Sequence, residues 1–150
     1  MSIEAVPTTR DEQVRQAWER IRTMVYNDDR RTEVSTALGL SFIKIKALRR
    51  LSATPMPMRD LATRLAMDKP YLTQIVDALE ERGLVVRTID ARDRRCRIVS
   101  LTDEGRAAAV RAEEILKRPP ALLADMPERD LAELNRILTS LPLTGDGEPS

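Results

Sequence analysis

Apolar residues recur along much of the chain at intervals of three and four positions, which is the period of an amphipathic helix. Ser41 and Pro70 stand where helices favour an N-cap and a first-turn proline, and Gly83 stands where helices favour a left-handed residue. The pair Pro119-Pro120 interrupts the pattern. The helical segments predicted in this way are residues 10–30, 41–54, 58–66, 70–82, 102–117 and 131–141.

Between the fourth and fifth helical segments the period changes to two, which predicts β-strands over residues 84–89 and 96–101. In the second strand Val99 and Leu101 fall on one face, and Thr102 follows as a suitable N-cap for the next helix. Because only a short turn separates the two strands, we expect them to pair as a β-hairpin.

The turn between these strands is rich in arginine. Arg92, Arg94 and Arg95 are crowded at the expected hairpin tip, which makes it a poor core element but a good probe for the phosphate-lined minor groove of DNA. We expect Arg92 and Arg94 to contact DNA. Asp90 and Asp93 should have a structural role in the turn, and Arg95 should either contact DNA or pair with one of these aspartates.

The order of elements predicts the fold. Two short helices joined by a tight turn and followed by a hairpin form a winged helix-turn-helix, so the fold class is mainly α (α+β) with a small sheet. The helix over residues 70–82 is then the recognition helix and the arginine-rich hairpin is its wing. The alternative is a small α+β domain whose charged hairpin is incidental.

The first half of the predicted recognition helix carries the side chains expected to reach DNA. Gln74 is the best candidate for reading a base, because an amide pairs bidentately with adenine. The alternative for each of these positions is an ordinary solvated helix face. The candidate contacts are Lys69, Pro70, Tyr71, Thr73 and Gln74.

The outer helices carry more apolar surface than one small winged domain needs. We therefore expect dimerisation helices over residues 10–38 and 107–141 on either side of a winged helix-turn-helix over residues 40–106, with a disordered tail over residues 142–150. The helical stripes concerned are Val14, Trp18, Ile21 and Val25, and Leu131, Leu134, Leu138 and Leu141.

Charge is distributed unevenly. The 150-residue chain has a formal net charge of +1, yet residues 44–106 contain 14 Lys and Arg against 9 Asp and Glu, a net of +5 that leaves −4 elsewhere. A basic middle between acidic ends indicates an anionic partner.

Composition excludes several classes of protein. Without histidine the chain lacks the usual general base and the commonest metal ligand, so we expect no enzyme activity, no metal and no cofactor. No apolar run reaches membrane-spanning length and the first residues do not resemble a signal peptide, so we expect a cytoplasmic protein. The single cysteine, Cys96, excludes an internal disulfide; it is either a strand packing residue or, flanked by Arg95 and Arg97, an oxidisable thiol.

The chain resembles the multiple-antibiotic-resistance regulator (MarR) family. The resemblance rests on Asp90-x-Arg-Asp-Arg-Arg95, on Val99-x-Leu-Thr-x-x-Gly-Arg106 and on Leu79-Glu-x-x-Gly-Leu-Val-x-Arg87. It covers residues 41–106 well and the outer helices in pattern only. Pro70 and Gln74 stand where the family often has Ser and Arg, which suggests a different operator preference.

The resemblance implies a homodimer that binds a pseudopalindromic operator in double-stranded DNA as a transcriptional regulator, most often a repressor. It also implies control by a small anionic or phenolic effector, or by oxidation. An effector pocket would lie between the winged domain and the dimerisation helices, where Trp18, Met24 and Tyr26 are candidates to line it. The rival interpretations are a winged-helix module that binds an acidic protein and a redox-responsive regulator that uses Cys96.

Overall fold

The computed structural model describes residues 9–26 and 29–143. The chain divides after Lys117 into two compact units, Met1–Lys117 and Arg118–Ser150, each of which is described by itself. The first unit contains α1 (Arg10–Tyr26), α2 (Arg30–Leu38), α3 (Phe42–Ala53), β1 (Met56–Pro57), α4 (Met58–Leu65), α5 (Lys69–Glu81), β2 (Val85–Ile89), β3 (Arg97–Leu101) and α6 (Asp103–Leu116). The second contains α7 (Ala121–Ala124) and α8 (Glu128–Ser140).

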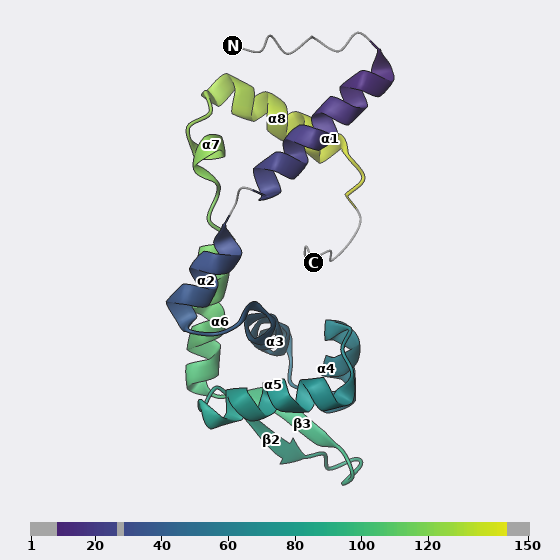
Figure 1. The fold of residues 1–150 in the computed structure, drawn as a ribbon, viewed down its shortest axis with the longest axis vertical. Coiled ribbons are helices and arrows are strands. Elements are labelled where there is room, and N and C mark those ends of the chain that lie inside the picture. Colours follow the sequence, from purple (N-terminus) through teal and green to yellow (C-terminus); the bar gives the residue numbers. More distant parts are fainter. Residues whose placement is uncertain (1–8, 27–28, 144–150) are drawn as a thin grey trace. The chain divides into compact units, whose positions relative to one another are not determined.

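The predicted winged helix-turn-helix fold is confirmed. Helices α4 and α5 lie next to each other as the helix-turn-helix, and the β2–β3 hairpin follows α5 along the chain (Figure 1). Helix α3 packs on α4 and α6. One continuous core lies between these elements, and its largest fully buried side chains are Ile45, Leu48, Leu51, Leu61, Leu72, Leu79, Val34, Val76, Val85 and Val99.

The sheet has three strands, in the order β1-β3-β2, where the sequence predicted only a hairpin. Strand β1 pairs antiparallel with β3 through Met56 opposite Val99 and Pro57 opposite Ile98. Two residues are too few to show a period of two, and a proline argues against a strand except at a sheet edge, which is where β1 lies. Met56 is almost completely buried and therefore anchors the segment between α3 and α4.

The N-terminal helical region differs from the prediction. A single helix was expected over residues 10–30, but α1 ends at Tyr26 and a separate helix α2 begins after Asp29. Helix α2 packs on α3 and α6 and buries Val34, so it contributes to the core of the winged domain. Arg82 stabilises its C-terminal end, because the guanidinium donates hydrogen bonds to the carbonyl oxygens of Gly39 at 2.6 Å and Leu38 at 3.3 Å.

Helix α6 also contributes to this core. Ala107 is exposed, whereas Ala109, Ala112 and Ile115 are buried against α2 and α3. The helix ends at Leu116, before the Pro119-Pro120 pair, as expected.

The second unit consists of the short helix α7, which was not predicted, and α8. Helix α8 begins at Glu128 after Pro127 and buries none of its residues. Of its apolar stripe, Leu138 is 41% exposed. The predicted disordered tail falls mostly on residues 144–150, which lie outside the described residues. Within the described ranges, the helices are too short or too polar to cross a lipid bilayer.

The junction between α5, β2 and α6 is the tightest point of the winged domain. Thr102 is the N-cap of α6: its hydroxyl accepts a hydrogen bond from Gly105 N at 3.0 Å and donates one to Gly83 O at 2.6 Å. Gly83 has a left-handed backbone with a φ of 72°. Leu84 N donates a hydrogen bond to Leu79 O at 2.9 Å, which closes α5 in a Schellman motif.

The first turn of α6 lies so close to this junction that only glycine fits at position 105. A Cβ atom there would lie 1.9 Å from the carbonyl oxygen of Leu84. We therefore expect Gly105→Ala to lower the free energy of unfolding by about 3 kcal/mol or more, since the clash is with backbone.

Gly83→Ala is the matched control for this prediction. Nothing lies within 4 Å of the Cβ position at Gly83, so the only cost is the left-handed backbone, about 1–2 kcal/mol. Urea denaturation followed by circular dichroism measures both variants. A Gly105→Ala protein as stable as Gly83→Ala would contradict the close approach of α6 to Leu84.

Candidate nucleic-acid interface

The recognition helix α5 is held at its start and along its inner face. At its N-terminus Asp68 is the N-cap, and its Oδ1 atom accepts a hydrogen bond from Tyr71 N at 2.8 Å. Pro70 lies in the first turn, where its missing N–H removes no intrahelical hydrogen bond. The inner face of the helix is buried in the core through Leu72, Ile75, Val76 and Leu79.

The opposite face of α5 is exposed to solvent at the start of the helix. Lys69, Pro70 and Gln74 are exposed, and Tyr71 is 45% exposed. Thr73 differs from the other predicted contacts, because it is only half-exposed and its hydroxyl donates a hydrogen bond to Lys69 O at 2.9 Å within its own helix. The structure therefore brings four of the five predicted residues to one accessible surface at the start of α5.

The wing tip is braced by its aspartates. Asp90 Oδ1 accepts a hydrogen bond from Arg92 N at 2.9 Å. Asp93 Oδ1 accepts one from Arg95 N at 3.1 Å and one from Arg95 Nε at 3.2 Å, and these two hydrogen bonds hold the pKa of Asp93 below its usual value. Both carboxylates thus bond to the turn itself, and Arg95 is paired with Asp93.

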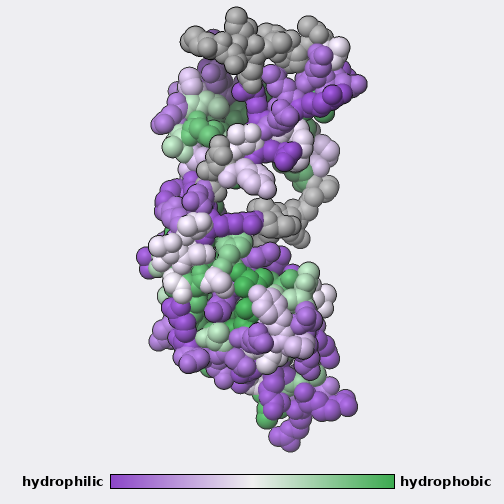
Figure 2. Space-filling view, viewed as in Figure 1, coloured by the Kyte–Doolittle hydropathy of each residue, from purple (hydrophilic) through white to green (hydrophobic). Residues whose placement is uncertain are grey.

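The other two turn arginines differ from Arg95. The side chains of Arg92 and Arg94 are exposed, and within the described part of the chain they form neither a hydrogen bond nor an ion pair. Two cationic side chains are therefore available at the hairpin tip. The space-filling view shows mainly hydrophilic residues at the end of the molecule that carries this hairpin (Figure 2).

Cys96 belongs to the same turn. Its Sγ atom donates a hydrogen bond to Asp93 Oδ2 at 3.5 Å and accepts one from Arg59 Nη1 of α4 at 3.8 Å. The thiol is half-buried and helps to hold the wing turn against α4. The described residues contain no group of Cys, Asp and Glu side chains arranged to hold a metal ion.

A further pair of contacts joins the wing to the recognition helix. Arg87 of β2 forms ion pairs with Asp77 through Nη2 at 2.5 Å and with Glu80 through Nε at 3.0 Å. The hydrogen bond to Glu80, followed by that to Asp77, raises the pKa of Arg87. The sequence shows Glu80 and Arg87 within one motif, but their partnership becomes visible only when β2 is placed beside α5.

The residues expected to line an effector pocket are not gathered in one cavity of the described chain. Trp18 is 59% exposed and Tyr26 83% exposed on α1. Tyr26 borders a shallow hollow of about 320 Å³ that Trp18 and Met24 do not line.

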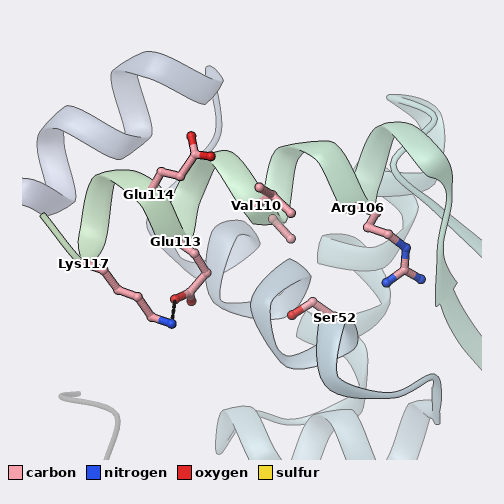
Figure 3. A pocket seen from close by; sticks show the side chains of 7 residues that line it. Ser52, Arg106, Val110, Glu113, Glu114 and Lys117 are labelled. Atoms are coloured by element: carbon pink, nitrogen blue, oxygen red, sulfur yellow. Dashed lines mark ion pairs between the residues drawn. The ribbon is translucent and has the colours of Figure 1, made fainter.

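A larger groove, of about 420 Å³, runs between α3 and α6 (Figure 3). Its lining includes Ala109 and Val110 together with several charged side chains. Glu113 is paired there with Lys117 at 3.2 Å and with Arg49. Burial opposes ionisation of Glu113, but the hydrogen bonds from Arg49 and Lys117 outweigh it and lower the pKa of this carboxyl.

Comparison with known proteins agrees with this geometry. The family model described as "MarR family" matches residues 38–95. An HTH-type transcriptional repressor of Mycobacterium tuberculosis is 32% identical over 116 residues, which cover 74% of this chain and 84% of the relative.

Two solved structures extend the comparison. The transcriptional repressor CouR bound to a 23-mer DNA duplex is 30% identical with a TM-score of 0.58, covering 91% of this chain and 98% of that one. The YusO protein of Bacillus subtilis shares the fold, with a TM-score of 0.73 at 20% identity, covering 92% of this chain and all of that one.

The fold, the exposed N-terminal face of α5 and the cationic wing define a winged helix-turn-helix DNA-binding transcriptional regulator. The chain belongs to the MarR family.

Proposed function

We propose that the chain is a homodimeric repressor that binds a pseudopalindromic operator and leaves it when a small anionic or phenolic effector binds. The observation that carries this proposal is the wing: its aspartates brace the turn while Arg92 and Arg94 remain available. In this arrangement the two arginines enter the minor groove and the first half of α5 enters the adjacent major groove. Such a regulator acts on the chromosome, in the cytoplasm.

The proposed dimer is supported by apolar surface that the described residues leave exposed. Helix α1 buries none of its residues, and its stripe includes Val14 at 58% and Trp18 at 59% exposure. Helix α8 also buries none, and Leu138 and Leu141 remain 41% and 48% exposed. A partner subunit would cover these stripes, and an effector pocket lined by Trp18 with Met24 and Tyr26 would then lie between the subunits and the winged domain.

The dimer is tested by sedimentation. At micromolar concentration we expect a mass of about 34 kDa, twice the 17.0 kDa of the chain. Leu138→Asp should shift the protein toward monomer, because a carboxylate would be buried in an apolar interface. Thr139→Asp, on another side of α8, is the control and should remain dimeric. A stable monomeric parent protein that binds a single half-site would disprove the proposed dimer.

The wing is tested by salt dependence. Replacing Arg92 and Arg94 with Ala should weaken binding to operator and random DNA alike, because each arginine neutralises a phosphate in both. The slope of log K against log salt should become shallower by about 0.9 for each phosphate that is no longer neutralised. Arg111→Ala removes an exposed arginine of α6 and should change neither quantity strongly. Unchanged affinity and slope in the double variant would show that the wing does not contact DNA, and would favour a module that binds an acidic protein.

Base reading is tested at Gln74. Gln74→Ala should cost roughly 1–3 kcal/mol on the operator, mainly at one base pair in each half-site, and little on random DNA. A binding-site selection compares the preferred sequences of the parent and the variant. If both select the same sequence and the variant binds operator and random DNA with equally reduced affinity, Gln74 contacts only the DNA backbone.

A further inference from the structure

The recognition helix carries acidic side chains immediately beyond the residues proposed to contact DNA. Asp77 follows Gln74 by three positions and therefore lies on nearly the same side of α5, and its side chain is 54% exposed. Glu80 follows one turn later and is 42% exposed. A helix that enters the major groove with unpaired carboxylates on this side would bring like charges toward the phosphates, which opposes binding.

Arg87 neutralises Asp77 and Glu80, although it is not part of the helix. It lies on β2, opposite Val99 of β3, and reaches across to α5. One guanidinium group meets both carboxylates, through Nη2 to Asp77 at 2.5 Å and through Nε to Glu80 at 3.0 Å. The Arg87 side chain is only 26% exposed and is engaged on two edges by these partners, so it is poorly placed to contact DNA itself.

We propose that Arg87 is a positioning residue for DNA binding: by neutralising Asp77 and Glu80, it allows the recognition helix to approach the phosphates. This inference rests on the proposed function, in which α5 enters the major groove. Arg87 acts by neutralising these carboxylates and not by contacting DNA. Its contribution to DNA affinity therefore depends on the presence of Asp77 and Glu80. Because charges more than about 10 Å apart are screened at about 0.1 M salt, the effect should be strongest at low salt.

The experiment measures the affinity for operator and for random DNA at several salt concentrations. Arg87→Gln should bind both DNAs about tenfold more weakly than the parent at about 50 mM salt, and this ratio should shrink as salt screens the exposed carboxylates. Adding Asp77→Asn and Glu80→Gln to Arg87→Gln should restore affinity to within about threefold of the parent, because the repelling charges are gone.

Glu114→Gln is the matched control. Glu114 is an exposed carboxylate of α6, away from the recognition helix, that Arg87 does not contact, so its neutralisation in the Arg87→Gln protein should restore less affinity than the pair Asp77→Asn and Glu80→Gln. A merely structural role for Arg87 would give no rescue, since the neutral triple variant also lacks the ion pairs. Circular dichroism confirms that each variant is folded.

A second variant keeps the test decisive if Arg87→Gln does not fold. Asp77→Asn with Glu80→Gln in the parent leaves the Arg87 cation unmatched beside the recognition helix, so it should bind DNA at least as tightly as the parent. Three results would each overturn the inference. The first is weaker DNA binding by the Asp77→Asn, Glu80→Gln protein than by the parent, and the second is an unchanged affinity and salt slope in Arg87→Gln. The third is a variant with all three substitutions that binds DNA as weakly as Arg87→Gln. A parent that fails to bind DNA at all would instead refute the proposed function.

Discussion

The winged domain depends on one close approach, between the first turn of α6 and the start of β2. Thr102 bonds to Gly83 and Gly105, and the absence of a side chain at Gly105 lets the helix lie against the carbonyl group of Leu84. The end of α5, the beginning of β2 and the beginning of α6 therefore meet within a few residues. This junction fixes how the recognition helix and the wing are placed relative to each other, because each of them leaves it through a rigid element.

Hydrogen bonds and ion pairs with carboxylates position the basic residues on the surface of the winged domain. At the wing tip Asp90 and Asp93 bond to backbone N–H groups, which shapes the turn and leaves Arg92 and Arg94 exposed. Between wing and helix the roles are reversed, and one arginine, Arg87, pairs with two carboxylates of α5. The +5 net charge of residues 44–106 therefore combines two kinds of cation: some hold the structure together, and others are available to an anionic partner.

Much of the fold could be predicted from the sequence, because helices α3 to α6, the β2–β3 hairpin and the cap at Thr102 follow from local pattern. Strand β1 could not, since two residues have no period and Met56 becomes a strand residue only by pairing with β3. The same distinction between local pattern and tertiary packing applies to the site. The exposure of Gln74 follows from helical period once the inner face is known. An ion pair such as Arg87 with Asp77 depends instead on how a strand packs against a helix, so only the structure separates arginines that support the site from those that are available to DNA.

The outer helices are subject to a different constraint from the winged domain. An isolated helix of the length of α1 or α8 is marginal in water, and most helical stability in proteins comes from packing an apolar face. Neither helix buries a residue within the described chain, although both carry an apolar stripe. The homodimer proposed above would supply the missing contacts to both helices at once. Dimer formation would then be needed both to fold α1 and α8 and to match the two half-sites of the operator. An effector that altered the packing of these helices would change the spacing between the two wings, and through it the affinity for DNA.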